Sequence, residues 1–481
     1  MKRLRTLFLF AMNFLKKYGQ NGSLVRYLDR IQISLYRFFL IRTGKGRVER
    51  IKEGEYMVEE LRSIFSQYKG LSRSAYVIFI GRVVTNMGAF IWPLLTLILA
   101  RKIGYTEMEI ALLSVMIGGL FLPANIIGGK LADKYSRKKI IIIFDIISVA
   151  FFMACAAVEP GNWMTFFFVM AGLFANMEHP AYEALIADVT KPQEREKVYS
   201  LSYLGHNLGF MFGAAIGGLL FENYLSLAFI LDGLTTLSST ILIVLFVKVI
   251  NVEELEETER NVYEDHAADG VTTFQILKER KSLLIQIAVA LFASFIYDQW
   301  SFVLPLYMTK IFTADAGRYF GLLSSFNGFV VIAFTPIMTR VLVKWRELRK
   351  VMLGLALYSF SYLILRGAVD YWIFFVMMFA FTLGEIINML GSAPFISRRA
   401  PASHRGRINS YRSIAYFVGG VGGRVVMGAL IERFSYGTAF AFLTAVGVGT
   451  VLLVAYNYRL DQKTFPKLYQ IPEDKIGEEI S

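Results

Sequence analysis

The chain has 481 residues, of which 55% are hydrophobic and 19% are charged, and its formal net charge is +13. Soluble domains carry roughly 25% charged residues, so the composition argues against a soluble protein of several domains. Much of the positive charge lies in short loops between apolar runs, which disfavours a nucleic-acid-binding protein. The single cysteine, Cys155, excludes an internal disulfide bond.

Long apolar runs indicate transmembrane helices. A helix needs about 20 mostly apolar residues to cross the hydrocarbon of a bilayer. In lipid the backbone must satisfy its own hydrogen bonds, which a helix does. The sequence therefore predicts an all-α membrane protein with twelve spans, at 74–100, 107–129, 140–158, 162–186, 198–221, 224–247, 282–309, 317–340, 350–367, 371–396, 408–431 and 435–458.

The loops after the even-numbered spans 2, 4, 8 and 10 carry clusters of Lys and Arg, and the opposite loops carry fewer. Cytoplasmic loops of membrane proteins are enriched in these residues. We therefore expect a multi-pass protein of a cell membrane, the bacterial inner membrane, with both termini in the cytoplasm.

The segments outside the spans are strongly charged. The first of them is basic, with apolar residues on one helical face, and we predict amphipathic helices on the anionic cytoplasmic leaflet. A docked tail without a function of its own is the alternative. The predicted organisation is a basic segment 1–72, a six-helix bundle 73–248, a cytoplasmic linker 249–281, a second six-helix bundle 282–458 and a cytoplasmic tail 459–481.

The two halves of the chain resemble each other. A shift of 210 residues superposes Arg195 on Arg405, Gly213 on Gly423 and Glu222 on Glu432, and a shift of 212 superposes Asn86 on Asp298 and Pro93 on Pro305. Chance matching of glycines is the alternative, which the basic and acidic matches disfavour. Parallel repeats of this kind place a substrate path between the two bundles, near the middle of the membrane.

The loop between spans 2 and 3 reads GGKLADKYSRKK and resembles the signature loop of the major facilitator superfamily, with Ser136 where a glycine is usual. The residues that match are Gly129, Asp133, Arg137 and Lys138. We expect Gly129 to let two helices approach closely. We expect Asp133 to pair with basic groups and so to favour one closed arrangement of the bundles.

Span 5 carries Gly209, Gly213, Gly217 and Gly218, and small residues at this spacing make a smooth face for helix packing. The pattern resembles the antiporter motif of the drug:proton exchangers in the same superfamily, with Ala214 where proline is usual. Helix packing without a role in transport direction is the alternative. The resemblance covers residues 73–458, and the arginine that this multidrug-exporter branch often carries in span 4 is absent.

Ionisable groups inside spans are costly and therefore mark candidate functional sites. Glu385, midway along span 10, is the first candidate for a carboxylate that binds a proton or contacts a cation, because burial favours the neutral carboxyl. Asp298 in span 7 is the second candidate, and the alternative for it is a fixed salt bridge between the halves, for example with Arg82.

Four further polar residues complete the predicted coupling site. Arg82 and Asn86 lie one turn apart on the same face of span 1, and we expect Arg82 to be structural or to pair with a carboxylate. Glu178 and His179 in span 4 are candidates for a proton relay.

The sequence contains no phosphate-binding loop, no metal-ligand spacing and no catalytic constellation, so we expect neither an enzyme nor a cofactor. The resemblance implies a secondary transporter that works by alternating access, with proton-coupled efflux of small amphipathic compounds as the favoured function. An importer or uniporter of a sugar, amino acid or organic acid is one alternative. A membrane-anchored regulatory protein that acts through residues 1–72 is the other. The expected partners are a small-molecule substrate, protons and the lipid bilayer, for a monomeric protein that does not bind nucleic acid.

Overall fold

The computed structural model describes residues 68–89, 91–190, 194–247, 272–401 and 404–470. The chain forms two compact units, Met1–Leu71 and Ser72–Ser481, and all the helices described here belong to the second. The predicted amphipathic helices of the first segment and most of the predicted linker lie outside the described residues.

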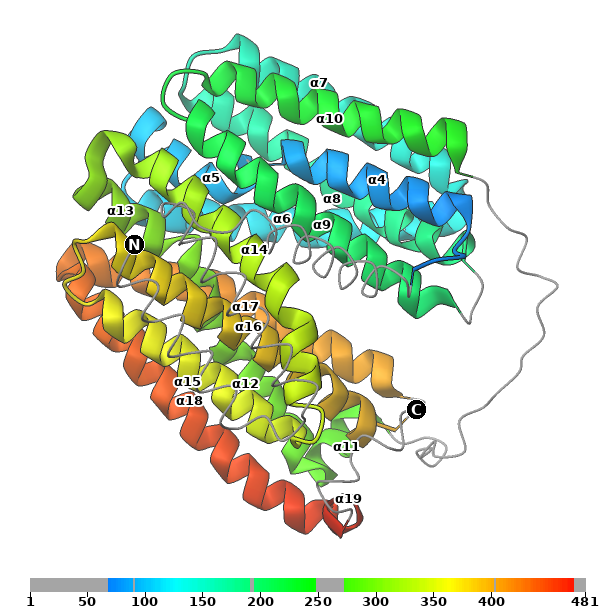
Figure 1. The fold of residues 1–481 in the computed structure, drawn as a ribbon, viewed down its shortest axis with the longest axis vertical. Helices are drawn as coiled ribbons and strands as arrows, with labels where there is room; N and C mark the ends of the chain where they lie inside the picture. Colours follow the sequence, from blue (N-terminus) through cyan, green and yellow to red (C-terminus); the bar gives the residue numbers. More distant parts are fainter. Residues whose placement is uncertain (1–67, 90, 191–193, 248–271, 402–403, 471–481) are drawn as a thin grey trace, which may run out of the picture. The chain divides into compact units, whose positions relative to one another are not determined.

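The second unit is built from helices, and no strand occurs in the described ranges. A first group, drawn from blue to green in Figure 1, comprises α4 (Arg73–Gly88), α5 (Ile91–Leu97), the π-helix η1 (Ile98–Ile103), α6 (Glu107–Lys134), α7 (Arg137–Ala157), α8 (Asn162–Asp188), α9 (Arg195–Leu220) and α10 (Leu225–Phe246). A second group, drawn from green to red, comprises α11 (Thr273–Glu279), α12 (Lys281–Tyr297), the 3-10 turn η4 (Asp298–Trp300), α13 (Val303–Phe312), the 3-10 turn η5 (Thr313–Asp315), α14 (Ala316–Val341), α15 (Glu347–Leu365), α16 (Tyr371–Arg399), α17 (Arg405–Arg433), α18 (Tyr436–Thr464) and α19 (Pro466–Gln470).

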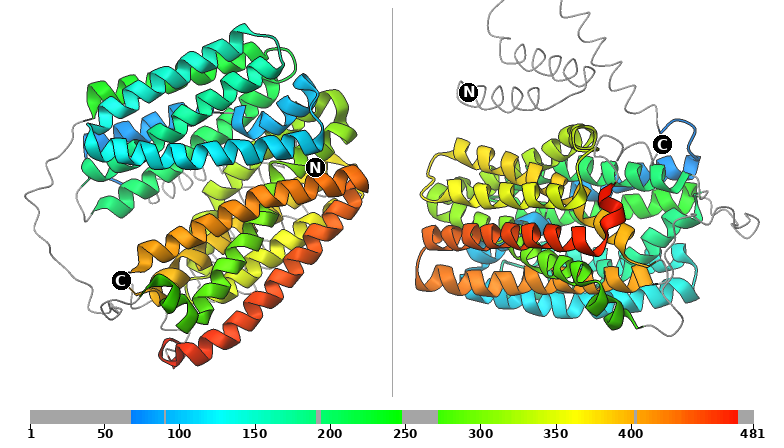
Figure 2. Two further views of the ribbon diagram at one scale, coloured as in Figure 1. Left: turned by 180° about the vertical axis from the view of Figure 1, so that it is seen from behind. Right: turned by 90° about the horizontal axis from the view of Figure 1, so that it is seen from below.

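Each group packs mainly within itself. In the first group α4 packs on α9 and α10, and α8 packs on α6 and α7. In the second group α12 packs on α17 and α18, and α16 packs on α14 and α15. The groups are joined mainly by α9 against α14 and α6 against α17, with smaller contacts of α5 against α13 and α14, and the views in Figure 2 show the groups as neighbouring bundles.

The helices of the two groups begin at equivalent positions. Pairs of helix starts that are separated by the predicted repeat are Ile91 and Val303, Arg137 and Glu347, and Arg195 and Arg405. The order of helices is therefore the same in both groups.

The helices are long and apolar enough to cross a membrane. Nine such stretches occur in the part of the chain that the structure describes, and one of them, Lys281–Val341, covers two of the predicted spans. Helices α8 and α9 account for the remaining two predicted spans. Leu245 and Leu452 are 67% and 65% exposed, as expected of side chains that face lipid. The predicted all-α membrane fold is confirmed.

The first and seventh spans are each interrupted, whereas the sequence predicted continuous helices. In the first span α5 begins at Ile91, and in the seventh η4 separates α12 from α13. Pro93 and Pro305 are each the third residue of the helix after the interruption. Proline is tolerated in the first turn of a helix, where an N–H would have no partner within the helix, but it would break a longer helix.

The two groups contact each other at one end, which we call the Glu107 end. There the hydroxyl of Tyr436 donates a 3.2 Å hydrogen bond to Glu107, across the groups. Gly321 and Gly218 also meet there, since a Cβ added to Gly321 would lie 2.5 Å from the carbonyl oxygen of Ala214. At the opposite end, the Asp133 end, the ion pairs recorded for the described residues each stay within one group.

Candidate functional site

Glu385 lies midway along α16, half-buried, and is held by neutral hydrogen-bond donors from two other helices. The hydroxyl of Tyr297, the last residue of α12, donates to Oε1 at 3.0 Å. Nδ2 of Asn327 on α14 lies 3.3 Å from Oε2 and 2.8 Å from the hydroxyl oxygen of Thr382. Among the described residues, the ion pairs do not include Glu385.

Aromatic rings fix the position of the Tyr297 hydroxyl. The Tyr297 ring stacks on Phe381 with centroids 5.5 Å apart, and it lies 6.1 Å from the ring of Tyr358. Tyr358 and Phe381 are fully buried, so their positions are set by core packing. The donor that holds Glu385 is therefore preorganised by the interior of the second group.

Asp298 is the first residue of η4 and pairs with Arg424 of α17. Nε of Arg424 donates to Oδ2 of Asp298 at 2.7 Å. Nη1 of Arg424 lies 3.1 Å from the hydroxyl oxygen of Ser114, and Nη2 lies 3.3 Å from that of Ser301. Ser114 belongs to α6, so the Arg424 guanidinium connects the two groups. Asp298 thus forms a salt bridge, as the alternative predicted, but its partner is Arg424 of the same group and not Arg82 of the other half.

Arg82 pairs instead with Glu183 of α8, inside the first group. Its Nε lies 3.4 Å from the hydroxyl oxygen of Ser202 on α9, and its guanidinium carbon lies 4.0 Å from the centre of the Tyr182 ring. Asn86 donates a 2.8 Å hydrogen bond to the carbonyl oxygen of Arg82, one turn earlier. Arg82 is thus a carboxylate partner that joins α4 to α8 and α9.

The predicted relay residues adjoin the same ion pair. Nε2 of His179 lies 3.9 Å from Oε1 of Glu183, and the His179 side chain is 56% exposed. Glu178 is half-buried on the same helix. Glu183 was not among the predicted site residues, although it lies four residues after His179 and therefore on the same helical face.

The signature loop joins α6 to α7 at the Asp133 end. Asp133 is 83% exposed, and its Oδ1 lies 3.9 Å from Nη1 of Arg137. Arg137 also reaches α8, where its Nε lies 3.4 Å from Oδ2 of Asp188. Lys138 donates to the carbonyl oxygen of Val247, just after α10. The basic residues of the loop therefore tie together helices of the first group.

The helix-packing role expected of Gly129 belongs to its neighbour Gly128. A Cβ added to Gly128 would lie 2.8 Å from the Cα of Met177 on α8, which is a severe overlap. A Cβ added to Gly129 would lie 3.8 Å from the Cβ of Pro180, an ordinary contact.

The glycines of α9 face two different helices. A Cβ added to Gly209 would lie 2.5 Å from the carbonyl oxygen of Val83 on α4, and one added to Gly213 would lie 2.6 Å from that of Asn86. Gly217 is buried. A Cβ added to Gly218 would lie 2.8 Å from the carbonyl oxygen of Gly317 on α14, so this glycine allows the two groups to approach closely.

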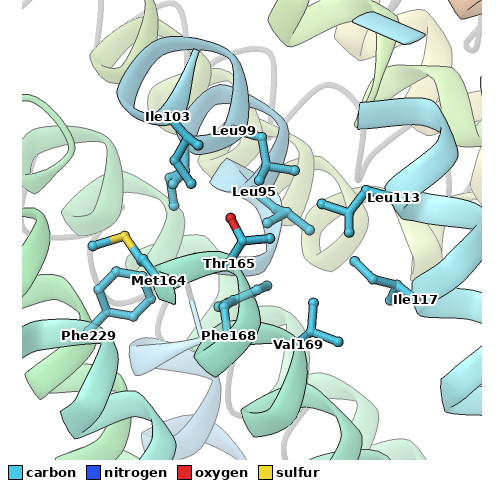
Figure 3. A pocket seen from close by; sticks show the side chains of 11 residues that line it. Leu95, Leu99, Ile103, Leu113, Ile117, Met164, Thr165, Phe168, Val169 and Phe229 are labelled. Carbon is cyan, nitrogen blue, oxygen red and sulfur yellow. The ribbon is translucent and has the colours of Figure 1, made fainter. Parts of the chain in front are cut away.

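Two cavities lie near these residues. One has a volume of about 350 Å³, lies between the groups, and is lined by Trp92 and Phe121 and by polar groups of Thr96, Ser114, Asn176, Ser301 and Arg424. The other, shown in Figure 3, has a volume of about 10 Å³ and is lined by apolar side chains such as Leu95 and Phe168, with the Thr165 hydroxyl among them. A volume of this size holds at most about one water molecule. The first cavity is therefore the candidate binding space.

The chemistry of the site is that of carboxylates, hydroxyls and amides. In the part of the chain that the structure describes, no group of three His, Cys, Asp or Glu residues could hold a metal ion. The polar side chains that line the cavity between the groups are those of Thr96, Ser114, Asn176, Ser301 and Arg424.

Comparison with known proteins shows what the chain resembles. The family model described as Major Facilitator Superfamily matches residues 78–423 and 317–473. A "Na(+), Li(+), K(+)/H(+) antiporter" of Planococcus maritimus is 27% identical over 426 residues, which are 82% of this chain and 98% of that protein. The multidrug resistance protein MdtH of Yersinia pestis (strain Pestoides F) is 24% identical over 161 residues, which are 33% of this chain and 40% of that protein.

Solved structures share the fold. A peptide transporter POT in complex with sulfate has a TM-score of 0.64 and 16% identity, over 82% of this chain and 96% of that chain. A POT family transporter in complex with 5-aminolevulinic acid has a TM-score of 0.65 and 13% identity, over 81% of this chain and 96% of that chain.

Proposed function

The chain belongs to the Major Facilitator Superfamily and is a membrane-spanning secondary transporter, and we propose that it is a proton-coupled antiporter that exports cations. The family resemblance seen in the signature loop is thereby confirmed. Membership also places the chain among transporters rather than enzymes, so its cargo moves through the membrane unchanged.

The observation that carries the proposal is the unpaired carboxylate of Glu385. Glu183 and Asp298 each have an arginine partner, whereas Glu385 is held by the Tyr297 hydroxyl and the Asn327 amide. A carboxylate fixed by an arginine is costly to protonate, because the arginine would lose its partner. Glu385 has no such partner to lose, so it can take up and release a proton. Its protonation would remove a charge from the middle of the second group and bias the exchange between conformations.

The closed Glu107 end supports an inward-facing state. The basic loops predict that the Asp133 end faces the cytoplasm. Contacts such as the Tyr436–Glu107 hydrogen bond join the groups at the other end. In this state a cytoplasmic cargo would reach the space between the groups, as the first step of export requires.

Inorganic monovalent cations are the first candidate cargo. The relative from Planococcus maritimus, which this chain matches over 98% of that protein's length, is named as an exchanger of Na⁺, Li⁺ and K⁺ for H⁺. The carboxylate and hydroxyl oxygens of the site are ligands that suit such hard cations.

Amphipathic organic cations are the second candidate, a subset of the small amphipathic compounds that the sequence predicted. The rings of Trp92 and Phe121 line the 350 Å³ cavity beside the polar groups. Aromatic faces attract organic cations. The partial match to a multidrug resistance protein favours the same cargo.

The proposal is tested in everted membrane vesicles that contain the full chain and are acidified inside by respiration. Addition of Na⁺, Li⁺ or K⁺ is expected to release protons, which a fluorescent reporter of the pH gradient records as dequenching. Vesicles without the protein provide the control, and ethidium tests the second candidate. If no cation, inorganic or organic, discharged the gradient beyond the control, cation–proton exchange would be refuted.

A further inference from the structure

The Arg424 guanidinium is surrounded by oxygen atoms from two segments of the chain, α6 and the interruption of the seventh span. Its three nitrogens lie 2.7 Å from Oδ2 of Asp298, 3.1 Å from the Ser114 hydroxyl and 3.3 Å from the Ser301 hydroxyl. One carboxylate and two hydroxyls are also a donor set that suits a monovalent metal cation. The guanidinium therefore occupies a position where the surrounding oxygen atoms could also bind a metal cation.

The interruption of the seventh span positions two of these oxygen-bearing side chains, those of Asp298 and Ser301. Asp298 begins η4, and Ser301 follows it before α13 starts. The carbonyl oxygen of Asp298 accepts a 3.0 Å hydrogen bond from the Ser301 hydroxyl. Discontinuous helices bring backbone oxygens to the middle of a membrane, where transporters bind ions.

Arg424 and the two serines that it contacts border open space. Ser114, Ser301 and Arg424 all line the 350 Å³ cavity. The side chains of Asp298 and Arg424 are 26% and 21% exposed, so the pair is not sealed inside the protein. The cavity gives a cargo ion access and gives the guanidinium room to move away.

The same guanidinium holds the two groups together. Asp298 and Ser301 belong to the second group, and Ser114 belongs to α6 of the first. Beside it, the hydroxyl of Thr96 donates a 2.7 Å hydrogen bond to the carbonyl oxygen of Ser301, which also crosses between the groups. Removal of the guanidinium from this position would therefore weaken the closed interface.

We propose that Asp298 binds the cargo cation and that Arg424 takes the place of that cation in the cargo-free state. Cargo and guanidinium compete for one carboxylate, so only one positive charge is bound at a time. When the cargo cation binds Asp298, Arg424 loses its carboxylate partner and its hydrogen bond to Ser114 breaks. The loss of this contact between the groups allows the Glu107 end to open. The proposal rests on the cation export proposed above and assigns Asp298 to cargo and Glu385 to protons.

The test combines transport with a direct measure of opening. Arg424→Gln keeps hydrogen-bonding groups but lacks the charge that competes with cargo. Its KM for the cation in everted vesicles is expected to fall by about tenfold, the effect of removing one competing charged hydrogen bond. Arg366→Gln, at an exposed arginine after α15, is the matched control and should keep the KM of the parent protein.

Opening is followed by cysteine labelling in nanodiscs. A cysteine at Ala111, which is buried on α6, is introduced into a chain carrying Cys155→Ser and treated with a water-soluble maleimide. In the parent protein Na⁺ is expected to speed labelling several-fold. With Arg424→Gln labelling should be fast without Na⁺, and with Arg424→Lys, which has one nitrogen in place of the three of the guanidinium, it should be intermediate.

The two readouts separate the possible failures. An unchanged KM together with slow labelling in Arg424→Gln would overturn the competition, even where the parent protein exchanges cations for protons. If Arg424→Gln does not fold, labelling of Arg424→Lys as slow as that of the parent protein without Na⁺ would overturn the competition instead. Failure of the proposed function instead appears as an absence of exchange in the parent protein, whatever the labelling rates.

Discussion

Replacement of Glu385 by Gln is expected to abolish cation-dependent proton release in everted vesicles, to the level of vesicles without the protein. The amide has nearly the same shape as the carboxyl, and its single oxygen can keep one of the two hydrogen bonds that Tyr297 and Asn327 donate. It cannot bind or release a proton in the physiological range. Exchange would therefore stop while the fold is retained, which a size-exclusion profile in detergent can check.

Two further variants show whether this effect is specific to the Glu385 carboxylate. Glu159→Gln makes the same chemical change at an exposed position after α7 and should leave exchange intact. Tyr297→Phe removes one donor to Glu385, and the loss of a hydrogen bond to a charged group, about 1.5–3 kcal/mol, should weaken coupling without abolishing it. Undiminished proton release by Glu385→Gln would show that the proton binds elsewhere.

The largest expected effect on stability concerns Asp461, near the end of α18. Its carboxylate accepts hydrogen bonds from Arg399 at 2.7 and 2.8 Å, from the Ser282 hydroxyl at 2.7 Å and from the Tyr469 hydroxyl at 2.6 Å. The Arg399 and Asp461 side chains are 2% and 0% exposed. Asp461→Ala would leave a buried guanidinium without this partner, which costs about 3–5 kcal/mol.

Thermal unfolding in detergent measures this effect. Asp461→Ala should lower the unfolding temperature markedly, and Glu432→Ala, at an exposed position, should not. The double variant Arg399→Leu, Asp461→Leu should recover much of the loss, because it removes both charges. Equal unfolding temperatures for Asp461→Ala and the parent protein would contradict the structural role given to this pair.

Tyr469 of α19 attaches the last described helix to the same carboxylate. Burial, together with the hydrogen bond to Asp461, raises the pKa of Tyr469 above its ordinary value. The phenol therefore stays protonated at physiological pH and keeps donating to Asp461. Residues 459–470, which the sequence assigned to a tail, thus include the end of α18 and a helix that packs on it.

The positions of the spans could be predicted because the thickness of a bilayer dictates the length of an apolar helix. Glu385 was found for the same reason, as an acidic residue in the middle of such a span. Its partners Tyr297 and Asn327 could not be found, because uncharged polar residues occur in most spans. Only the packing of α12 and α14 against α16 singles them out.

The pairing of charges could not be predicted, because it depends on which helices face each other. Several arginines within spans, among them Arg82, Arg412 and Arg424, were available to Asp298, and only the fold assigns one to it. The prediction of Gly129 as the packing glycine, where the structure has Gly128, failed for a related reason. Neighbouring residues on a helix point about 100° apart, and hydropathy does not fix the rotation of a helix this finely.

The matched interruptions of the first and seventh spans have a consequence for the transport cycle. They place Asn86 and Asp298 at equivalent points of the repeat, one neutral and the other acidic. The scaffold is therefore duplicated, but the carboxylate at this position is not. We expect an exported ion to stay bound to the second bundle throughout the cycle. The first bundle would move relative to that site and expose it to one side of the membrane and then to the other.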